Sequence, residues 1–148
     1  MLVENPLSTS PSAYPVLECF HIAGFALAIG MTALVDFRLL GFGLLGQSAA
    51  QIMRAFQGWT LGGLVIAVFS GLLIFSTDPD MYYLNGSFLL KMAFLVTAII
   101  FNYTIHRQSV SGRYSNRAAR LIAVVSLLLW TSVIFGGIFI AVAPHGPG

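Results

Sequence analysis

Four stretches of the chain are long and almost wholly apolar, and short polar segments separate them. They cover residues 15–40, 58–76, 87–106 and 120–143. Roughly 20 apolar residues in a helix cross a bilayer core about 30 Å thick. Each stretch therefore predicts one membrane-spanning helix. Because the connections are short, we expect a single all-α domain over residues 1–148, an integral membrane four-helix bundle.

The segments between the stretches contain helix start signals. Ser48 and Gln51 have the spacing of a capping box. Residues 48–57 are therefore expected to form an interfacial helix that runs into the second span. Further helix starts or turns are predicted at Asp78-Pro79, Asn85-Gly86 and Ser115.

Composition supports a membrane protein and argues against other classes. Of the 148 residues, 57% are apolar and 8% are charged, against roughly 25% charged residues in an average soluble domain. So little charge argues against a soluble enzyme and a disordered chain. A net charge of +2 gives no reason to expect nucleic acid as a partner. One cysteine excludes an internal disulfide.

The basic residues predict an orientation. Lys and Arg are enriched in cytoplasmic connections of membrane proteins. All the arginines lie in or beside the first and third connections: Arg38, Arg54, Arg107, Arg113, Arg117 and Arg120. We therefore expect these two connections in the cytoplasm and both termini on the outer, periplasmic side.

Ionisable residues inside spans are costly and are functional candidates. On the first span Glu18, His21 and Asp36 fall within an arc of about 60° at 100° per residue, with Gly24 beside it. On the third span a second stripe contains Lys91, Asn102 and His106. Each of the two helices thus has one polar face.

Depth divides these residues into two groups. At 1.5 Å per residue, His21 lies about 9 Å and Lys91 about 6 Å from the outer ends of their helices. These two residues and Glu18 are expected at one level near the outer face. A secondary polar cluster is expected near the cytoplasmic face and consists of Asp36, Arg38, Asn102 and His106.

Structural interpretations exist for both groups. Glu18 and Lys91 could form an ion pair, or Lys91 could extend to the outer surface. Asp36 with Arg38 or Arg107 could form a purely structural network. His21, as an imidazole in an apolar helix, suits haem iron.

Small residues and one tryptophan suggest close contacts without identifying their object. Glycines allow helices to approach one another, and the same gaps would admit a flat macrocycle. Trp130 lies in the middle of the fourth span and could stack on a cofactor or pack in the core. The small residues considered are Gly62, Gly63, Ser70, Gly71, Gly136 and Gly137.

One set of motifs resembles a known group of proteins. His21-Ile22-Ala23-Gly24 leads to Asp36-Phe37-Arg38-Leu39-Leu40-Gly41, and Lys91 follows early in a third helix. These motifs resemble an uncharacterised family of small bacterial four-helix membrane proteins. They are more distantly similar to the four-helix haem-binding protoporphyrinogen oxidases and to the membrane domain of the copper-resistance D family.

The resemblance implies a haem b site in a multi-pass protein of the bacterial inner (cytoplasmic) membrane. In the oxidase family a first-helix histidine and a third-helix lysine bear on haem b, and His21 and Lys91 match these positions. His21 would be an axial ligand to the haem iron, oriented by Glu18. Lys91 would ligate from the other side if neutral, or pair with a propionate or Glu18 if charged. Gly24 and Trp130 complete the expected cofactor site.

Four functions follow as alternatives, and the last of them, a copper-handling role, is weakened because the five methionines are scattered along the chain. The first is a membrane b-type haem protein, an electron-transfer or redox module near the outer face with a quinone or a redox protein as partner. The second is an enzyme similar to the porphyrinogen oxidases. The third is a cofactor-free structural or transport subunit. Whether the chain is an enzyme, such as a membrane oxidoreductase, is left open by the residues. A homo-oligomer in the lipid bilayer is expected.

Overall fold

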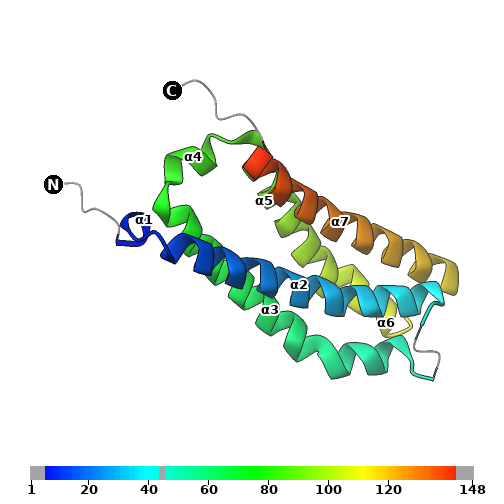
Figure 1. Cartoon of the computed structure of the whole chain (residues 1–148). Coiled ribbons are helices and arrows are strands. Elements are labelled where there is room, and N and C mark those ends of the chain that lie inside the picture. Colours follow the sequence, from blue (N-terminus) through cyan, green and yellow to red (C-terminus); the bar gives the residue numbers. More distant parts are fainter. Residues whose placement is uncertain (1–5, 44–45, 143–148) are drawn as a thin grey trace.

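The computed structural model of the chain describes residues 6–43 and 46–142, and every element in them is helical (Figure 1). Most of the third span is the α-helix α5, and it continues through a π-helical segment, η1, into α6. The elements in chain order are α1 (Pro6–Thr9), α2 (Ala13–Leu40), α3 (Ala49–Thr77), α4 (Pro79–Tyr83), α5 (Gly86–Phe101), η1 (Asn102–His106), α6 (Arg107–Val110) and α7 (Asn116–Val142).

Four helical stretches are long and apolar enough to cross a bilayer, as expected of a multi-pass membrane protein. They are Ala13–Leu40, Ala49–Phe75, Gly86–Val110 and Asn116–Ile140. Each region contains one predicted span, although the second and fourth predicted spans end later, at residues 76 and 143. At 1.5 Å per residue, the 28 residues of α2 are about 42 Å long, so this helix reaches beyond a hydrocarbon core of about 30 Å.

The helix bounds differ from the predicted ones where polar residues continue a helix. The interfacial segment 48–57 runs into the second span within α3, as predicted, and the other bounds differ. The third span continues past the predicted end at His106 to Val110. The fourth helix begins at Asn116, before the expected start at 120. Its predicted end at residue 143 lies outside the described residues.

The predicted caps explain where several helices start. Ser48 and Gln51 form the expected capping box at the start of α3. Asp78 caps α4, whose first residue is Pro79. Asn85 does not form an isolated turn: its side chain accepts hydrogen bonds from the first backbone amides of α5. Ser115 Oγ accepts from the backbone N–H of Ala118, and α7 begins beside it.

The bundle consists of two helical hairpins. α2 packs along α3, α5 packs along α7, and α2 joins the hairpins through α7 (Figure 1). α3 and α5 make few close backbone contacts. The core between the hairpins contains Ala28, Leu64, Leu95, Ala98, Trp130 and Val133.

The α2–α3 contact is close because small residues face one another. A Cβ atom added to Gly24 would lie 2.7 Å from the backbone nitrogen of Ala67 and 2.7 Å from the carbonyl oxygen of Gly63. A Cβ atom added to Gly63 would lie 2.8 Å from the backbone nitrogen of Ala28. Both helices thus present a Gly-xxx-Ala pair, the small-residue spacing that brings membrane helices together.

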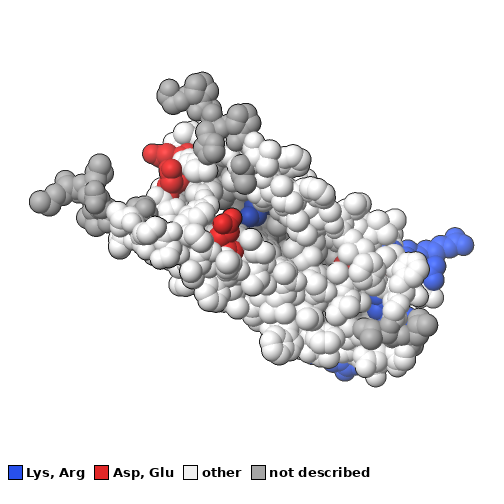
Figure 2. Space-filling model, viewed as in Figure 1, with Lys and Arg blue, Asp and Glu red and all other residues white. Residues whose placement is uncertain are grey.

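Charge and apolar surface are distributed as a bilayer requires. Most of the basic surface lies at one end of the bundle, whereas the acidic residues and one small basic patch lie toward the other (Figure 2). Bulky apolar side chains that no other helix covers include Phe20, Phe69 and Leu128. Lipid is the natural solvent for these side chains.

Candidate functional site

His21 on α2 and Lys91 on α5 lie in direct contact. His21 Nε2 and Lys91 Nζ are 3.4 Å apart, and both side chains are half-buried. The two residues come from different hairpins, so the contact bridges the bundle. The two residues were expected at one depth in the membrane, and in the fold they are close enough for a hydrogen bond.

The other nitrogen of the His21 ring is held by the backbone of α3. His21 Nδ1 lies 2.7 Å from the carbonyl oxygen of Ala67 and 3.3 Å from Ser70 Oγ. Since a carbonyl oxygen can only accept, Nδ1 carries the proton and donates it. Nε2 of the neutral ring then carries a lone pair, and this lone pair is directed at Lys91.

The sequence assigned the orienting role to Glu18, and the structure gives it to the Ala67 carbonyl. Glu18 is exposed. A backbone carbonyl leaves no mark in a sequence pattern, so this partner could not be predicted. The one sequence feature that could have indicated α3 as the neighbour of His21 was the small residue Gly71 on that helix.

Glycines beside the pair make room for its side chains. A Cβ atom added to Gly71 would lie 2.7 Å from His21 Cε1, and one added to Gly136 would lie 2.9 Å from Lys91 Cβ. A Cβ atom at Gly137 would lie 3.5 Å from Lys91 Nζ. The space beside Gly71 is thus occupied by His21, and the space beside Gly136 and Gly137 by Lys91.

An aromatic ring completes the surroundings of the pair. The Phe25 ring meets the His21 ring edge to face, with centroids 4.9 Å apart. Lys91 Nζ lies 5.3 Å from the Phe25 centroid, within the range of a cation–π contact. Phe25 therefore favours a charged Lys91, whereas burial favours the neutral amine.

Gly24 and Trp130 have packing roles in the structure. Gly24 is buried against the backbone of α3, as described above. Trp130 is 3% exposed and belongs to the core cluster between the hairpins. Of the expected cofactor-site residues, the structure thus brings His21 and Lys91 into contact.

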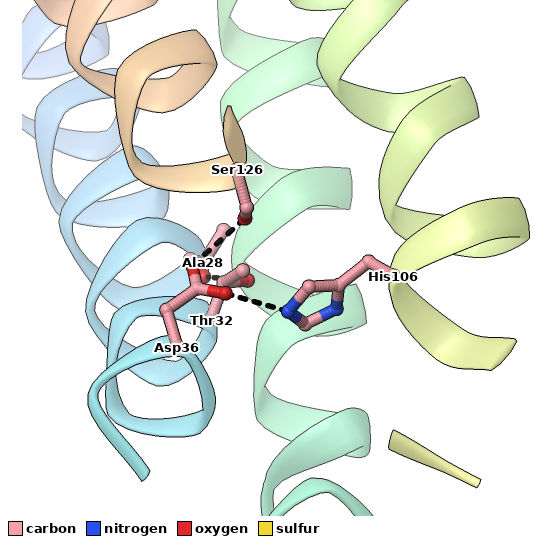
Figure 3. A network of polar contacts seen from close by, with 5 residues as sticks. All are labelled: Ala28, Thr32, Asp36, His106 and Ser126. Carbon is pink, nitrogen blue, oxygen red and sulfur yellow. Dashed lines mark hydrogen bonds and ion pairs between the residues drawn. The ribbon is translucent and has the colours of Figure 1, made fainter. Parts of the chain in front are cut away.

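A second polar cluster is fully buried between α2, η1 and α7 (Figure 3). Asp36 Oδ1 lies 2.6 Å from His106 Nε2, and Ser126 Oγ donates to Asp36 Oδ2 at 2.7 Å. One turn earlier on α2, Thr32 Oγ1 donates to the Ala28 carbonyl. Asp36 and His106 are both 0% exposed.

The partners within this cluster differ from the expected ones. Asp36 was expected to pair with Arg38 or Arg107 and pairs with His106 and Ser126. Arg38 Nε instead donates to the carbonyl of Gln47 at 2.6 Å. Ser126 was not predicted as a partner, because nothing in the fourth span marks one serine among the others.

His106 lies at the end of the π-helical segment η1. π-helical segments are rare in proteins, and those that occur are often found at functional sites. The wider turn changes which residues face inward, and it follows fifteen residues of ordinary α-helix after Gly86. No sequence signal predicted it.

A cavity of about 50 Å³ lies beside His106, between α2, α3 and the third span. His106 Nδ1 is buried and has no hydrogen-bond partner among residues 6–43 and 46–142. Asn102, expected in this cluster, lines the cavity. The other lining residues are Met31, Thr32, Val35, Met53, Phe56, Gln57, Thr60, Tyr103, His106 and Arg107.

Two tyrosines are joined at the opposite end of the bundle. The hydroxyl groups of Tyr14 and Tyr82 are 3.1 Å apart. The Tyr82 ring packs against Phe75 and Phe88. Burial, and next the Tyr14 hydroxyl, raise the pKa of Tyr82 well above its ordinary value of 10.0.

Comparison with known proteins identifies the family. Residues 13–143 match the model of a family of unknown function, DUF6644, so the chain belongs to that family. No curated protein and no solved structure matches the chain. Within the described residues, no group of three or more His, Cys, Asp or Glu side chains is placed to hold a metal ion.

Proposed function

We propose that this member of the DUF6644 family is a membrane b-type haem protein, an electron-transfer or redox module, in which His21 would hold the haem iron. One observation carries the proposal. The Ala67 carbonyl fixes His21 Nδ1 as the protonated nitrogen and leaves the Nε2 lone pair facing Lys91 Nζ. Metal-ligating histidines are commonly oriented in this way by a carbonyl or carboxylate on the second nitrogen.

The residues present fit a haem iron in their chemistry. Imidazole is a common axial ligand of haem, and a neutral lysine amine can supply a second nitrogen from the other hairpin. His21 and Lys91 are the residues that would hold the group. When bound, haem supplies one-electron redox chemistry, while Ala67 keeps the His21 ring in one tautomer.

A cofactor-free structural role is the second candidate, and one observation favours it. His21 fills the space beside Gly71, and Lys91 fills the space beside Gly136. The pair would then connect the hairpins through its hydrogen bond and the Phe25 contact. Buried polar pairs of this kind can specify how helices pack.

The visible spectrum of the protein purified in mild detergent separates the two candidates. A haem protein shows a Soret band and, after reduction, α and β bands. His21→Ala should abolish them, whereas His145→Ala, which removes another of the chain's three histidines, should leave them unchanged. A colourless, folded protein whose addition leaves the spectrum of hemin unchanged would exclude haem binding.

An enzyme similar to the porphyrinogen oxidases is a narrower form of the same proposal. It rests on the resemblance of the His21 and Lys91 positions. Expression in a bacterial strain that lacks its porphyrinogen oxidase tests it. Growth that is restored by the wild-type chain and lost with His21→Ala supports the enzyme. A haem-containing protein that fails to restore growth limits the function to electron transfer, with a quinone or a redox protein as partner.

We further propose that the chain lies in the bacterial inner membrane with both termini in the periplasm. The arginines at one end of the bundle support this orientation, because basic residues are retained on the cytoplasmic side. The haem site would then lie near the outer face. Alkaline phosphatase fused after residue 148 should be active, and a green fluorescent protein fused there should be dark. The opposite pattern would reverse the orientation.

We also propose that the protein forms a homo-oligomer through the exposed faces of its helices. Gly62 on α3 is exposed, with open space around the position of a Cβ atom, and an exposed glycine allows a second helix to approach closely. Light scattering with correction for bound detergent measures the mass of the particle. A mass of one chain at all protein concentrations would contradict an oligomer.

A further inference from the structure

The buried Asp36–His106 pair has the arrangement of an oriented base. An ionised carboxylate only accepts hydrogen bonds. Asp36 receives one from Ser126 at Oδ2, and His106 Nε2 lies 2.6 Å from Oδ1. An ionised Asp36 therefore requires that His106 Nε2 carry a proton and donate it. In the neutral ring the remaining nitrogen, Nδ1, then carries an unshared lone pair.

That lone pair is buried and has no partner within the described structure. His106 is 0% exposed, and Nδ1 makes no hydrogen bond. Buried polar atoms are nearly always satisfied, so an orphan needs an explanation. His106 itself lines the cavity beside it. An O–H group in this cavity would satisfy Nδ1.

The cavity suits such a donor in size and lining. Its volume of about 50 Å³ exceeds the 10–15 Å³ that a water molecule needs. Thr32, Thr60 and Asn102 offer further polar partners, and Met31 and Phe56 make part of the wall apolar. Either water or the hydroxyl end of a lipid-soluble molecule matches this mixture.

The ionisable groups that face the cavity are few. Besides His106 they are Tyr103 and Arg107. Arg107 is exposed, and its Nη2 donates to Gln57 Oε1 at 3.4 Å. Tyr103 and Arg107 both line the cavity and are exposed.

We infer that Asp36 and His106 form a proton-accepting site, in which His106 Nδ1 takes a proton from an O–H group in the cavity. The O–H bond breaks, its electron pair stays on oxygen, and the Nδ1–H bond forms. A hydronium ion leaves water behind, and a phenolic hydroxyl leaves a phenolate. The Asp36 carboxylate balances the imidazolium charge and holds the ring in place, as carboxylates do for basic histidines. This inference does not depend on haem at His21.

Nitrogen NMR of the full chain, labelled with ¹⁵N-histidine in detergent micelles, tests the inference. His106→Gln assigns the His106 signals by their loss. We expect a protonated Nε2 and an unprotonated Nδ1 at neutral pH. On acidification the Nδ1 signal should move to the protonated position while the protein remains folded. A protonated Nδ1 at neutral pH, or a signal that stays fixed until unfolding, would overturn the proposal.

Two variants separate proton acceptance from packing. Asp36→Asn removes the balancing charge, so Nδ1 should become protonated only at lower pH than in the wild type. Ser126→Ala removes one hydrogen bond to Asp36 but keeps its charge, so protonation of Nδ1 should persist. Loss of protonation in Ser126→Ala, with unchanged protonation in Asp36→Asn, would contradict the assigned role of the charge. If Asp36→Asn does not fold, the protonation of Nδ1 in the wild type and in Ser126→Ala still tests the proposal.

The source of the proton is found by adding a donor. Trimethylhydroquinone carries the hydroxyl group, and trimethylbenzoquinone is its matched control without one. A shift of the His106 Nδ1 signal with the hydroquinone alone supports a lipid-soluble donor. If the hydroquinone leaves the Nδ1 signal unchanged but exchange into deuterium oxide shifts it, the result supports water as the donor. No response to either would overturn the proposal.

Discussion

His21 and Lys91 are 70 residues apart in the sequence, and their side-chain nitrogens lie 3.4 Å apart in the fold. Asp36 and His106 are also 70 residues apart, and they lie 2.6 Å apart. Both pairs join the first span to the third, and in an up-and-down bundle these spans run in the same direction. Equal sequence separations then keep both pairs level, so the two pairs connect the same two spans at two depths.

Replacing Gly71 by alanine should displace His21. The new Cβ atom would lie 2.7 Å from His21 Cε1, a distance that requires the ring or the helix to move. Overpacking of this kind costs typically 1–3 kcal/mol. Unfolding in mixed detergent micelles, followed by tryptophan fluorescence, measures the loss. In addition, the His21 ring signals should shift in the NMR spectrum.

Gly58→Ala is the matched control on the same helix. No atom from another part of the described structure lies within 4 Å of its Cβ position. Its stability should equal or slightly exceed that of the wild type, because alanine favours the helix. Equal losses in Gly71→Ala and Gly58→Ala would argue against the close contact at His21.

Replacing Gly24 by alanine should separate α2 from α3. Its Cβ atom would meet backbone atoms of Gly63 and Ala67 at 2.7 Å, and a backbone cannot turn aside as a side chain can. The loss of stability should therefore exceed that of Gly71→Ala. Gly30→Ala, on the same helix and with open space around it, is the control. A Gly24→Ala protein as stable as Gly30→Ala would contradict the observed helix contact.

The second cluster predicts an order of stability losses. Asp36→Ala leaves the donors of His106 and Ser126 without an acceptor, and each unsatisfied buried group costs about 1–3 kcal/mol. Ser126→Ala removes one hydrogen bond and leaves Asp36 bonded to His106, at a cost of about 1 kcal/mol. The same unfolding assay ranks the two. A larger loss in Ser126→Ala would mean that Asp36 does not organise the cluster.

Hydrophobic length and capping residues predicted most of the fold. The four apolar stretches are found as four helices, and Ser48 begins α3 with the predicted capping box. These features could be predicted because they depend on residues adjacent in the chain. The continuation of the third span to Val110 was missed, because Arg107 and Gln108 are polar but remain in a helix that extends beyond the apolar stretch.

The candidate site was predicted only in part, since its partners are distant or belong to the backbone. Helical periodicity placed His21, Lys91, Asp36 and His106 on inward faces, and the fold brings them together in pairs. The Ala67 carbonyl that orients His21 has no sequence signature. His106, the partner of Asp36, is the last residue of the π-helical segment η1, which apolar periodicity does not predict.

Tyr82 predicts a fall in stability at high pH. The folded state raises the pKa of Tyr82 above 10.0, whereas an unfolded tyrosine titrates near 10. Above that pH the folded chain keeps a proton that the unfolded chain has lost, so unfolding becomes more favourable as pH rises. This contribution to stability is fully present below about pH 10. Tyr82→Phe should make the decline shallower, as measured by unfolding from about pH 8 to about pH 11.

Tyr83→Phe is the control for this titration. Tyr83 is the next residue of α4 and is 51% exposed, so its removal should leave the decline unchanged. Tyr82→Phe keeps the ring contacts with Phe75 and Phe88 and loses only the hydroxyl contact with Tyr14. A constant offset at every pH would therefore reveal the hydrogen bond alone. A change in slope, present in Tyr82→Phe and absent in Tyr83→Phe, assigns the high-pH decline to the buried phenol.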